Sequence, residues 1–237
     1  SEAHTTSVDV SEPHTYSASG NYTVTLTATD ESGNEANATT TVKIVSSDDY
    51  DWFIPLKAGW NLISIPYELE NSSIESVFGS ILPDIAYESG NYTIFQYDAV
   101  SGTWRKNKPH KNHDGFYSTG TLKEIKPGYA YWIKMANDAV LYGKKKEYEP
   151  PKLPLPSITL KTGAWNLIGR YGVGEALELS TVFVYELEDN YYTPVLEYTG
   201  TTWSAADYIN TYQGYWLRTK VSDQNTIAYE PGPYYFT

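Results

Sequence analysis

Apolar and polar residues alternate along the first part of the chain. Between Asn21 and Asp30 every second position is apolar, and the alternation returns from Ala36 to Val45. A period of two predicts strands that are buried on one face. Residues 30–34, Asp-Glu-Ser-Gly-Asn, have the composition of a turn. We therefore predict a β-hairpin with a five-residue connection.

Further along, strand-like patterns are interrupted once by a helical one. We expect a strand over Leu56–Pro66, a hairpin of residues 92–98 with 103–106, and strands within 125–135 and at 139–142. Within residues 72–81, four apolar residues fall on one helix face: Ile74, Val77, Phe78 and Ile81. With Ser72 or Ser73 as the N-cap, this pattern predicts one short amphipathic helix.

The second and third parts of the chain repeat one arrangement of residues. Leu-Lys-Ala-Gly-Trp-Asn-Leu-Ile at 56–63 returns as Leu-Lys-Thr-Gly-Ala-Trp-Asn-Leu-Ile at 160–168, and the Gly-Tyr-Ala-Tyr-Trp of 128–132 returns as the Gly-Tyr-Trp of 214–216. Three tryptophans recur in order: Trp60 and Trp165, Trp104 and Trp203, Trp132 and Trp216. Blocks of roughly 80 to 90 residues indicate a duplicated domain, not a solenoid of short repeats.

These patterns divide the chain into four parts. We predict a partial β-sandwich segment at residues 1–45, a β domain at 52–143, a proline-rich linker at 144–156 and a second β domain at 157–237. The fold class is mainly β: an incomplete immunoglobulin-like segment, then two homologous small β-sandwich or barrel domains, with one short helix in the first. A proline-rich linker is a stiff spacer, so we expect it to hold the two β domains at a fixed separation. The helix equivalent of the second domain, at 176–184, has a weaker pattern.

Composition adds limits on function. The chain has 23 Tyr, 7 Trp and 6 Phe, which suit half-buried strand surfaces, and no Cys, so disulfides and thiolate metal sites are absent. Its formal net charge is −12, and its pattern indicates no clustered basic face, so we expect neither nucleic acid nor an anionic membrane as a partner. No stretch approaches the roughly 18 to 20 apolar residues of a membrane span. We expect no membrane insertion within this segment, and any anchor outside it.

Two resemblances to known families follow from these motifs. His-Thr-Tyr at 14–16, the Gly-x-Tyr-x-Val-x-Leu of 20–26 and Asp30 resemble the C-terminal half of a PKD domain, an immunoglobulin-like β-sandwich. The upstream half of that family has no counterpart here. Half a sandwich exposes a strand edge and an apolar face. We expect it to be cut from a larger domain, or completed by the next module or by another chain.

The paired blocks resemble a module of archaeal and bacterial surface and secreted proteins, of the S-layer type. The opening at Leu56–Pro66, the Gly-Thr-Trp of 102–104 and the Pro-Gly-x-x-Tyr-Trp-Ile of 127–133 carry this resemblance. The second block departs from it at Arg170 and at Gln213. The resemblance implies an extracellular or cell-surface location and a structural role, and it implies no reaction.

Tryptophans invite a carbohydrate-binding interpretation, because sugar rings stack on exposed indoles. The matched tryptophans lie in apolar strand patterns, so we expect core packing to be their main role. Trp104 and Trp203 follow Gly-Thr and Thr-Thr turns, and we predict that they are the most exposed and the candidate ligand-binding residues. Trp52 has no counterpart in the second block, and we expect it to pin the modules together.

One cluster has metal-ligand chemistry: His110, His113 and Asp114, within the insertion of the first block. The nearby Lys106, Lys108 and Lys111 oppose a cation, so we expect a solvated loop and no metal. Asp30 and Glu31 are a weaker candidate for calcium, and the expected cofactor is none.

Asn-x-Ser/Thr sequons make four asparagines candidates for N-glycosylation: Asn21, Asn37, Asn71 and Asn91. The sequence has no nucleophile elbow, no phosphate-binding glycine loop and no His-Glu-x-x-His. Nothing among its 29 acidic residues points to the carboxylate pair of a glycosidase. We therefore do not expect an enzyme.

Together these observations predict a non-enzymatic structural or adhesive module of an extracellular or cell-surface glycoprotein, such as an S-layer, sheath, filament or stalk component. Expected partners are other copies of the chain or neighbouring surface proteins, with a cell-surface glycan as a further candidate. The alternative is an accessory substrate- or carbohydrate-binding module of a secreted hydrolase.

Overall fold

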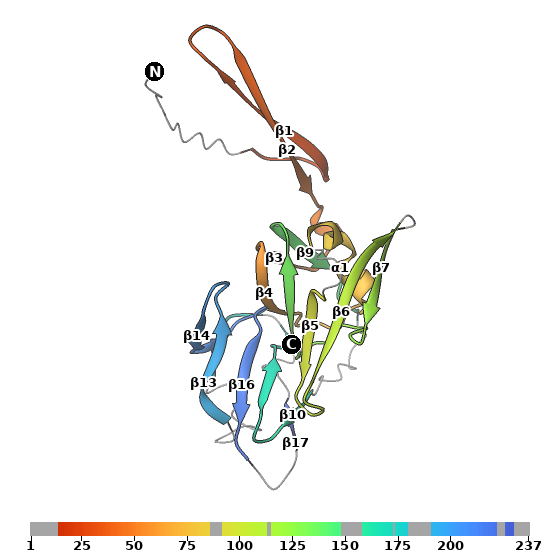
Figure 1. The fold of residues 1–237 in the computed structure, drawn as a ribbon, viewed down its shortest axis with the longest axis vertical. Helices are drawn as coiled ribbons and strands as arrows, with labels where there is room; N and C mark the ends of the chain where they lie inside the picture. The colour runs from red at the N-terminus through yellow and green to blue at the C-terminus, as the bar shows by residue number, and fades with distance from the viewer. Residues whose placement is uncertain are drawn as a thin grey trace. The chain divides into compact units, whose positions relative to one another are not determined.

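The structure, a computed structural model, describes residues 14–85, 92–112, 115–147, 158–172, 174–179, 191–221 and 226–229. It is mainly β, as predicted, with several small open sheets in the described residues. The chain divides into two compact units, Ser1–Tyr50 and Asp51–Thr237 (Figure 1).

The first unit is the predicted hairpin. Strand β1 (Gly20–Thr29) pairs antiparallel with β2 (Glu35–Ile44), and a short 3-10 helix, η1 (Ser47–Asp49), follows. The expectation of one buried face is wrong, because Val24 is 40% and Leu26 63% exposed. No second sheet covers this hairpin among the described residues of the unit, so its alternating apolar side chains remain in solvent.

The first block of the second unit contains a five-stranded and a two-stranded sheet. Five antiparallel strands lie in the order β4-β8-β5-β6-β7, and β3 pairs with β9. The strands are β3 (Trp52–Leu56), β4 (Gly59–Ser64), β5 (Ile94–Asp98), β6 (Thr103–Asn112), β7 (Gly115–Gly120), β8 (Ala130–Met135) and β9 (Ala139–Gly143). Trp52 pairs with Gly143, so the two ends of this block meet in one sheet. Trp52 is only 2% exposed and belongs to the core of the block, not to a linker.

The predicted helix is confirmed as α1 (Ile74–Phe78), which continues into the 3-10 helix η2 (Gly79–Asp84). Ser73 is the N-cap, and its Oγ accepts a hydrogen bond from the backbone N–H of Ser76 at 3.3 Å. The four residues of the predicted apolar face are all buried at 5% exposure or less: Ile74, Val77, Phe78 and Ile81. They fill the core of the first block.

The strand predicted over Leu56–Pro66 is present as β4 but is shorter, and Leu56 ends β3, which lies in another sheet. β3 ends and β4 begins around Gly59, whose φ of 97° favours glycine. The Asn61 side chain holds this corner, because its Oδ1 accepts from the Lys57 N–H at 2.9 Å and its Nδ2 donates to the Lys57 carbonyl at 2.7 Å. Asn166 makes the same pair of contacts in the second block. The Asn of the repeated Trp-Asn motif is therefore a corner residue.

The second block repeats the topology of the first. The order β11-β16-β13-β14 matches β4-β8-β5-β6, and the pair β10-β17 matches β3-β9. The strands are β10 (Ile158–Lys161), β11 (Trp165–Ile168), β12 (Leu177–Glu178), β13 (Tyr191–Tyr198), β14 (Trp203–Ala206), β15 (Tyr208–Ile209), β16 (Tyr215–Thr219) and β17 (Thr226–Tyr229). The weaker helix predicted at 176–184 lies mostly outside the described residues, which place β12 near its start.

The two blocks contact each other through pairs of equivalent interactions. Two isolated β-bridges join them, Ile63 with Gln213 and Ile168 with Tyr129. The Ser64 N–H donates to the Tyr212 carbonyl at 2.9 Å, and the Gly169 N–H donates to the Gly128 carbonyl at 2.8 Å. Each contact thus occurs twice with the roles of the blocks exchanged. The joint has the form of an isologous dimer interface within one chain.

Side chains seal the same joint. Leu62 and Ala130 of the first block form a buried cluster with Leu167 of the second. Tyr129 also packs against the core of the second block, and Tyr212 packs against the core of the first. The blocks touch directly within one compact unit, so contacts between them hold them together, and the predicted role of the linker as a stiff spacer stays a prediction. Residues 148–157, most of the predicted linker, lie outside the described residues.

At one position of the joint the two copies carry different residues in the same unusual backbone conformation. Gly128 has a φ of 82°, and its equivalent in the hydrogen-bond pattern is Tyr212, with a φ of 68°. Tyr212 is the one non-glycine residue at positive φ in the described part of the chain. A bulky residue in this region costs about 1–2 kcal/mol. The packing of its ring, and a hydrogen bond to the Tyr67 side chain, offset that strain.

Gly214→Ala is expected to destabilise the protein by about 1–3 kcal/mol, through overpacking of the joint. An added Cβ would lie 2.6 Å from Ala130 Cβ and 2.8 Å from Leu62 Cγ. Thermal and urea unfolding measure the effect. Gly79→Ala is the matched control, since a Cβ there meets nothing within 4 Å. Equal stability of the Gly214 and Gly79 variants would contradict the joint described here.

Tyr212→Gly is expected to be more stable than Tyr212→Ala, although glycine is usually the more destabilising replacement. Both variants lose the ring, but only glycine relieves the strain of a positive φ, by about 1 kcal/mol. Urea unfolding of the two variants side by side tests this. A more stable alanine variant would show that the backbone at this position is unstrained.

Candidate functional site: an aromatic face shared by both blocks

Strand register places aromatic side chains on the outer face of both larger sheets. In the first block, Trp60 pairs with Lys134 and Phe95 with Trp132 across neighbouring strands. Successive strand residues point to opposite faces, so the motif tryptophans alternate with the buried isoleucines that fill the core. Nine rings form one connected group, here called the aromatic platform: Trp60, Phe95, Tyr97, Trp104, Trp132, Trp165, Tyr198, Trp203 and Trp216.

The centre of the aromatic platform is a reciprocal exchange between the blocks. Trp132 of the first block contacts Tyr198 and Trp203 of the second, with ring centroids 4.9 and 5.7 Å apart. Trp216 of the second block makes the same contacts with Tyr97 and Trp104 of the first, at 5.4 and 6.1 Å. Several of these pairs are edge-to-face, the arrangement that aromatic rings favour.

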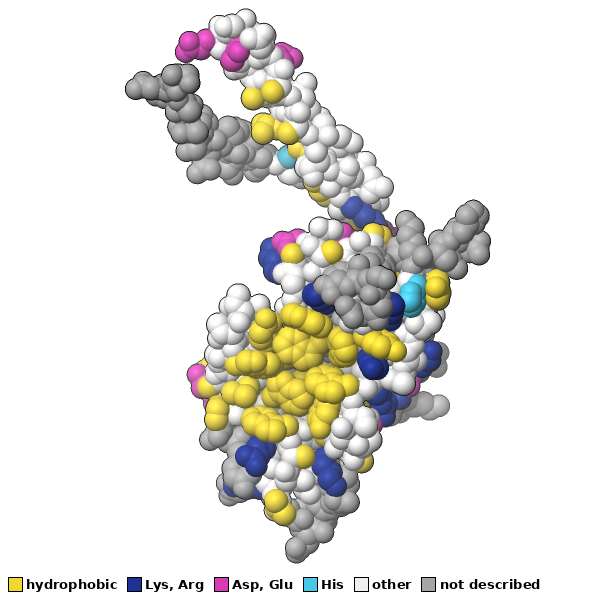
Figure 2. Space-filling model, in the orientation of Figure 1, with side chains coloured by type: hydrophobic (Ala, Val, Ile, Leu, Met, Phe, Trp, Pro, Cys, Tyr) yellow, Lys and Arg dark blue, Asp and Glu magenta, His cyan; other side chains and the backbone are white. Residues whose placement is uncertain are grey.

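Much of the aromatic platform faces solvent. Trp60, Trp104, Trp165 and Trp203 are each 38 to 44% exposed. Figure 2 shows the apolar side chains as one continuous patch across the face. Six platform rings and Lys106 line an open hollow of about 630 Å³ where the two blocks meet. The rings are Trp60, Phe95, Trp104, Trp132, Tyr198 and Trp203.

This arrangement corrects one expectation about the tryptophans. Core packing was expected for all three matched pairs, but only Trp132 and Trp216 are half-buried, and the other four indoles are exposed. The apolar neighbours that suggested burial point to the opposite face of the same strands. Trp104 and Trp203 are the two most exposed tryptophans, at 43 and 44%, as expected. Their role as ligand-binding residues stays a prediction.

Cations lie beside the aromatic platform, which sequence reasoning missed. Lys106 lines the hollow, and Lys134 Nζ lies 6.0 Å from the ring centroid of Trp60. Lys106 also stands over the Tyr92 ring, at 4.3 Å. Trp60, Lys106 and Lys134 are far from one another in the sequence, but strand pairing brings them to one face of the sheet. Lysine and arginine side chains lie at the border of the patch in Figure 2.

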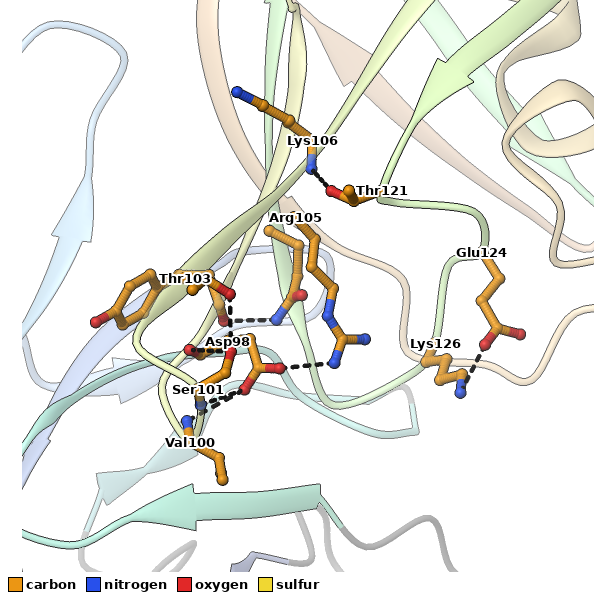
Figure 3. Close-up of polar contacts among 11 residues, drawn as sticks. Asp98, Val100, Ser101, Thr103, Arg105, Lys106, Thr121, Glu124 and Lys126 are labelled. Carbon is orange, nitrogen blue, oxygen red and sulfur yellow. Dashed lines mark hydrogen bonds and ion pairs between the residues drawn. The ribbon is translucent and has the colours of Figure 1, made fainter.

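The turn between β5 and β6 aligns the strands that carry Tyr97 and Trp104. Asp98 Oδ1 accepts hydrogen bonds from the N–H groups of Val100 and Ser101, and Oδ2 accepts from Arg105 Nη2 at 2.6 Å (Figure 3). Burial acts to raise the pKa of Asp98, but the hydrogen bonds from Ser101 and Arg105 outweigh it and hold the pKa below its usual value.

Figure 3 also shows how the next loop is attached to this hairpin. The Thr121 Oγ1 accepts a hydrogen bond from the backbone N–H of Lys106 at 3.1 Å. The Lys106 side chain extends away from the turn. Glu124 and Lys126 form an ion pair at 2.7 Å. Both side chains of that pair are about half exposed, so we assign it little weight in stability.

The candidate metal cluster is only partly described. The insertion expected to be a solvated loop is a β-hairpin, because β6 extends to Asn112 and β7 follows. His110 lies on β6, where it stacks on Tyr117 at 4.9 Å and its Nε2 lies 2.9 Å from Thr119 Oγ1. His113 and Asp114 lie outside the described residues. Within the described ranges, no group of three His, Asp or Glu side chains is placed to hold a metal ion.

The calcium candidate has a structural role in its turn. Asp30 accepts three hydrogen bonds of 2.8 Å, from the N–H of Ser32, the N–H of Asn34 and the Asn34 side chain. The hydrogen bonds from the Asn34 side chain and backbone lower the pKa of Asp30. Both carboxylate oxygens are thus engaged in holding the hairpin connection, and Glu31 is exposed.

Three of the four sequons are described. Asn21, Asn37 and Asn71 are exposed, and Asn91 lies outside the described residues. Asn37 Oδ1 accepts a hydrogen bond from Thr27, and Asn71 Oδ1 accepts one from the Ser73 N–H. Their glycosylation stays a prediction.

The comparisons with known proteins add one family. A model of the PKD domain matches residues 4–45, the segment whose motifs resemble that domain. No curated protein matches the chain, and no solved structure matches it. PKD domains are common in extracellular structural and adhesive modules. In the described part of the chain, no helix has the length and hydropathy needed to cross a membrane.

Asp98→Asn is expected to destabilise the protein at pH 7 by about 1 kcal/mol, through loss of the charged partner of Arg105. The pKa of Asp98 is lower in the folded than in the unfolded state. Its contribution is therefore present above the unfolded pKa, about 3.9, and is lost as pH falls through the folded value. Urea unfolding at pH 7 and below pH 3 should show that the difference in unfolding free energy between wild type and Asp98→Asn becomes smaller in acid.

Asp138→Asn is the control for that measurement. Its pair with Lys57 has side chains 59% and 80% exposed, so its replacement should change stability less than that of Asp98. If the difference in unfolding free energy between wild type and Asp98→Asn stays constant across this pH range, the charged hydrogen bonds of Asp98 are not its cause.

Proposed function

We propose that this chain is a non-enzymatic adhesive module of an extracellular or cell-surface protein, and that the aromatic platform is its contact surface. One observation carries the proposal: nine rings from two blocks form a single connected group, and four of its tryptophans are 38 to 44% exposed. Large contiguous apolar patches on soluble proteins mark sites of interaction. Trp and Tyr are also the residues that dominate binding energy at interfaces.

The extracellular part of the proposal is supported by the match to the PKD domain at residues 4–45. The exposed sequons of Asn21, Asn37 and Asn71 are compatible with a glycoprotein. In such a setting the chain would serve in an S-layer, sheath, filament or stalk, and it would meet copies of itself, neighbouring surface proteins or surface glycans.

The lining of the hollow supports binding over catalysis. Its described lining residues are aromatic apart from Lys106, and no carboxylate or histidine is among them. Histidine and carboxylates are the usual general acids and bases, and of the other groups that serve this chemistry the described lining holds only the Tyr198 hydroxyl and the Lys106 ammonium group. An apolar, open surface supplies contact area, which is what adhesion needs.

A second candidate function is an accessory carbohydrate-binding module of a secreted hydrolase. The observation that favours it is the exposure of indoles along one face, with Trp60, Trp104 and Trp203 around a shared hollow. A pyranose ring presents a face of C–H groups that packs on an indole, and its hydroxyls remain in water. Several indoles in one surface would hold successive sugars of a chain.

The double variant Trp104→Ala/Trp203→Ala is expected to lose contact formation at least tenfold, because exposed aromatic anchors dominate such surfaces. Pull-down on insoluble polysaccharides and light scattering for self-association measure the two kinds of contact. Circular dichroism and the melting temperature check that the fold is kept.

Tyr208→Ala is the matched control, since Tyr208 is 46% exposed on β15 and is not part of the platform. It should bind and associate like the unmodified chain. If the double variant also behaves like the unmodified chain in both assays, the platform is not the contact surface.

A further inference from the structure

We infer that the ligand of the aromatic platform is an acidic polysaccharide, a chain of sugars that carry carboxylates. Its rings would stack on the exposed indoles, and its carboxylates would meet the cations that share the same sheet face. This inference rests on the proposed function, because it takes the aromatic platform as the contact surface and names what binds there.

Strand alternation places the cations among the rings of the first block. Lys106 lies two residues after Trp104 on β6, and Lys134 lies two residues after Trp132 on β8. Residues two apart on a strand share a face. Lys134 pairs with Trp60 across β4 and β8. Each ammonium group therefore stands next to an exposed or half-exposed indole.

The second block repeats this juxtaposition. Arg218 lies two residues after Trp216 on β16, and it pairs with Trp165 in the register that joins Lys134 to Trp60. Arg218 is exposed. An indole with a cation opposite it thus occurs at equivalent positions of both copies, so one extended ligand could meet the same pair of chemical groups twice.

In the described strands, the carboxylates nearest to the platform point away from this face. Asp98 follows Tyr97 on β5, and Glu197 precedes Tyr198 on β13, so strand alternation turns both acids to the opposite face of their sheets. In the described strands around the platform, no acidic residue occupies a position on the same face as the rings. The whole chain has 29 acidic and 17 basic residues. A locally cationic face on an acidic protein is complementary to an anionic ligand.

The extracellular setting of the proposed function, supported by the match to the PKD domain, favours a polysaccharide over a nucleic acid. Single-stranded nucleic acids also combine stacking with negative charge, so the test below includes one. A uronate polymer presents one carboxylate beside each apolar ring face, which matches cations placed beside indoles.

The test uses the full chain with sodium polygalacturonate and with the same polymer after methyl esterification, which removes the charge and keeps the sugar. Calorimetric titration should show tighter binding of the charged form, weakened by added salt because exposed charges are screened. Lys106→Gln/Lys134→Gln should weaken binding of the charged polymer roughly three- to tenfold, and should leave the esterified polymer unaffected. Lys123→Gln is the charge-matched control, since that lysine neighbours Glu75 beside α1.

The other outcomes separate this inference from the proposed function. Equal binding of both polymers, with no effect of the lysine variant, would overturn the inference and leave the aromatic platform as a carbohydrate surface. Self-association that depends on Trp104 and Trp203, without binding to either polymer, would overturn it in favour of a second copy as the occupant. Preference for an oligothymidylate would overturn it in favour of nucleic acid. Absence of any contact that depends on those tryptophans would overturn both proposals.

Discussion

The reciprocal packing of Trp132 and Trp216 is the interaction on which the second unit depends. Each indole extends from its own sheet onto a Tyr–Trp pair of the other block. Beneath them, Leu62, Ala130 and Leu167 exclude water from the joint. These contacts turn two small sheets, each with limited core, into one body. They also create the exposed face, because the same rings that cross the joint continue outward into the neighbouring indoles.

Duplication explains why the joint has this form. Two copies that meet around an approximate two-fold axis make every contact twice, so a single favourable pairing contributes double. The copies nevertheless differ, both away from the joint and at it. The first has the extra hairpin strand β7, and the second has Tyr212 where the first has Gly128. That tyrosine keeps a strained backbone because its ring fills space against the first core.

Much of the local structure could be predicted from residue patterns. The hairpin around Asp30, the helix capped by Ser73, and the turn between β5 and β6 follow from short-range rules of turns, caps and periodicity. The strand expected from Leu56 begins only at Gly59, because the Asn61 side chain closes a corner that alternation alone does not indicate. The expected loop around His110 was wrong because its partner strand follows directly, and pairing satisfies its backbone groups.

The sequence by itself determined that the protein is mainly β, that it contains two copies of one unit, and that three tryptophans recur in each. It did not determine whether those tryptophans are buried or exposed. Alternate residues of a strand point to opposite faces of the sheet, and which face is buried depends on what packs against it. Only the tertiary structure decided that question, by packing one block on the other edge to edge. That packing joined the aromatic faces into one surface and gathered lysines distant in sequence along its border.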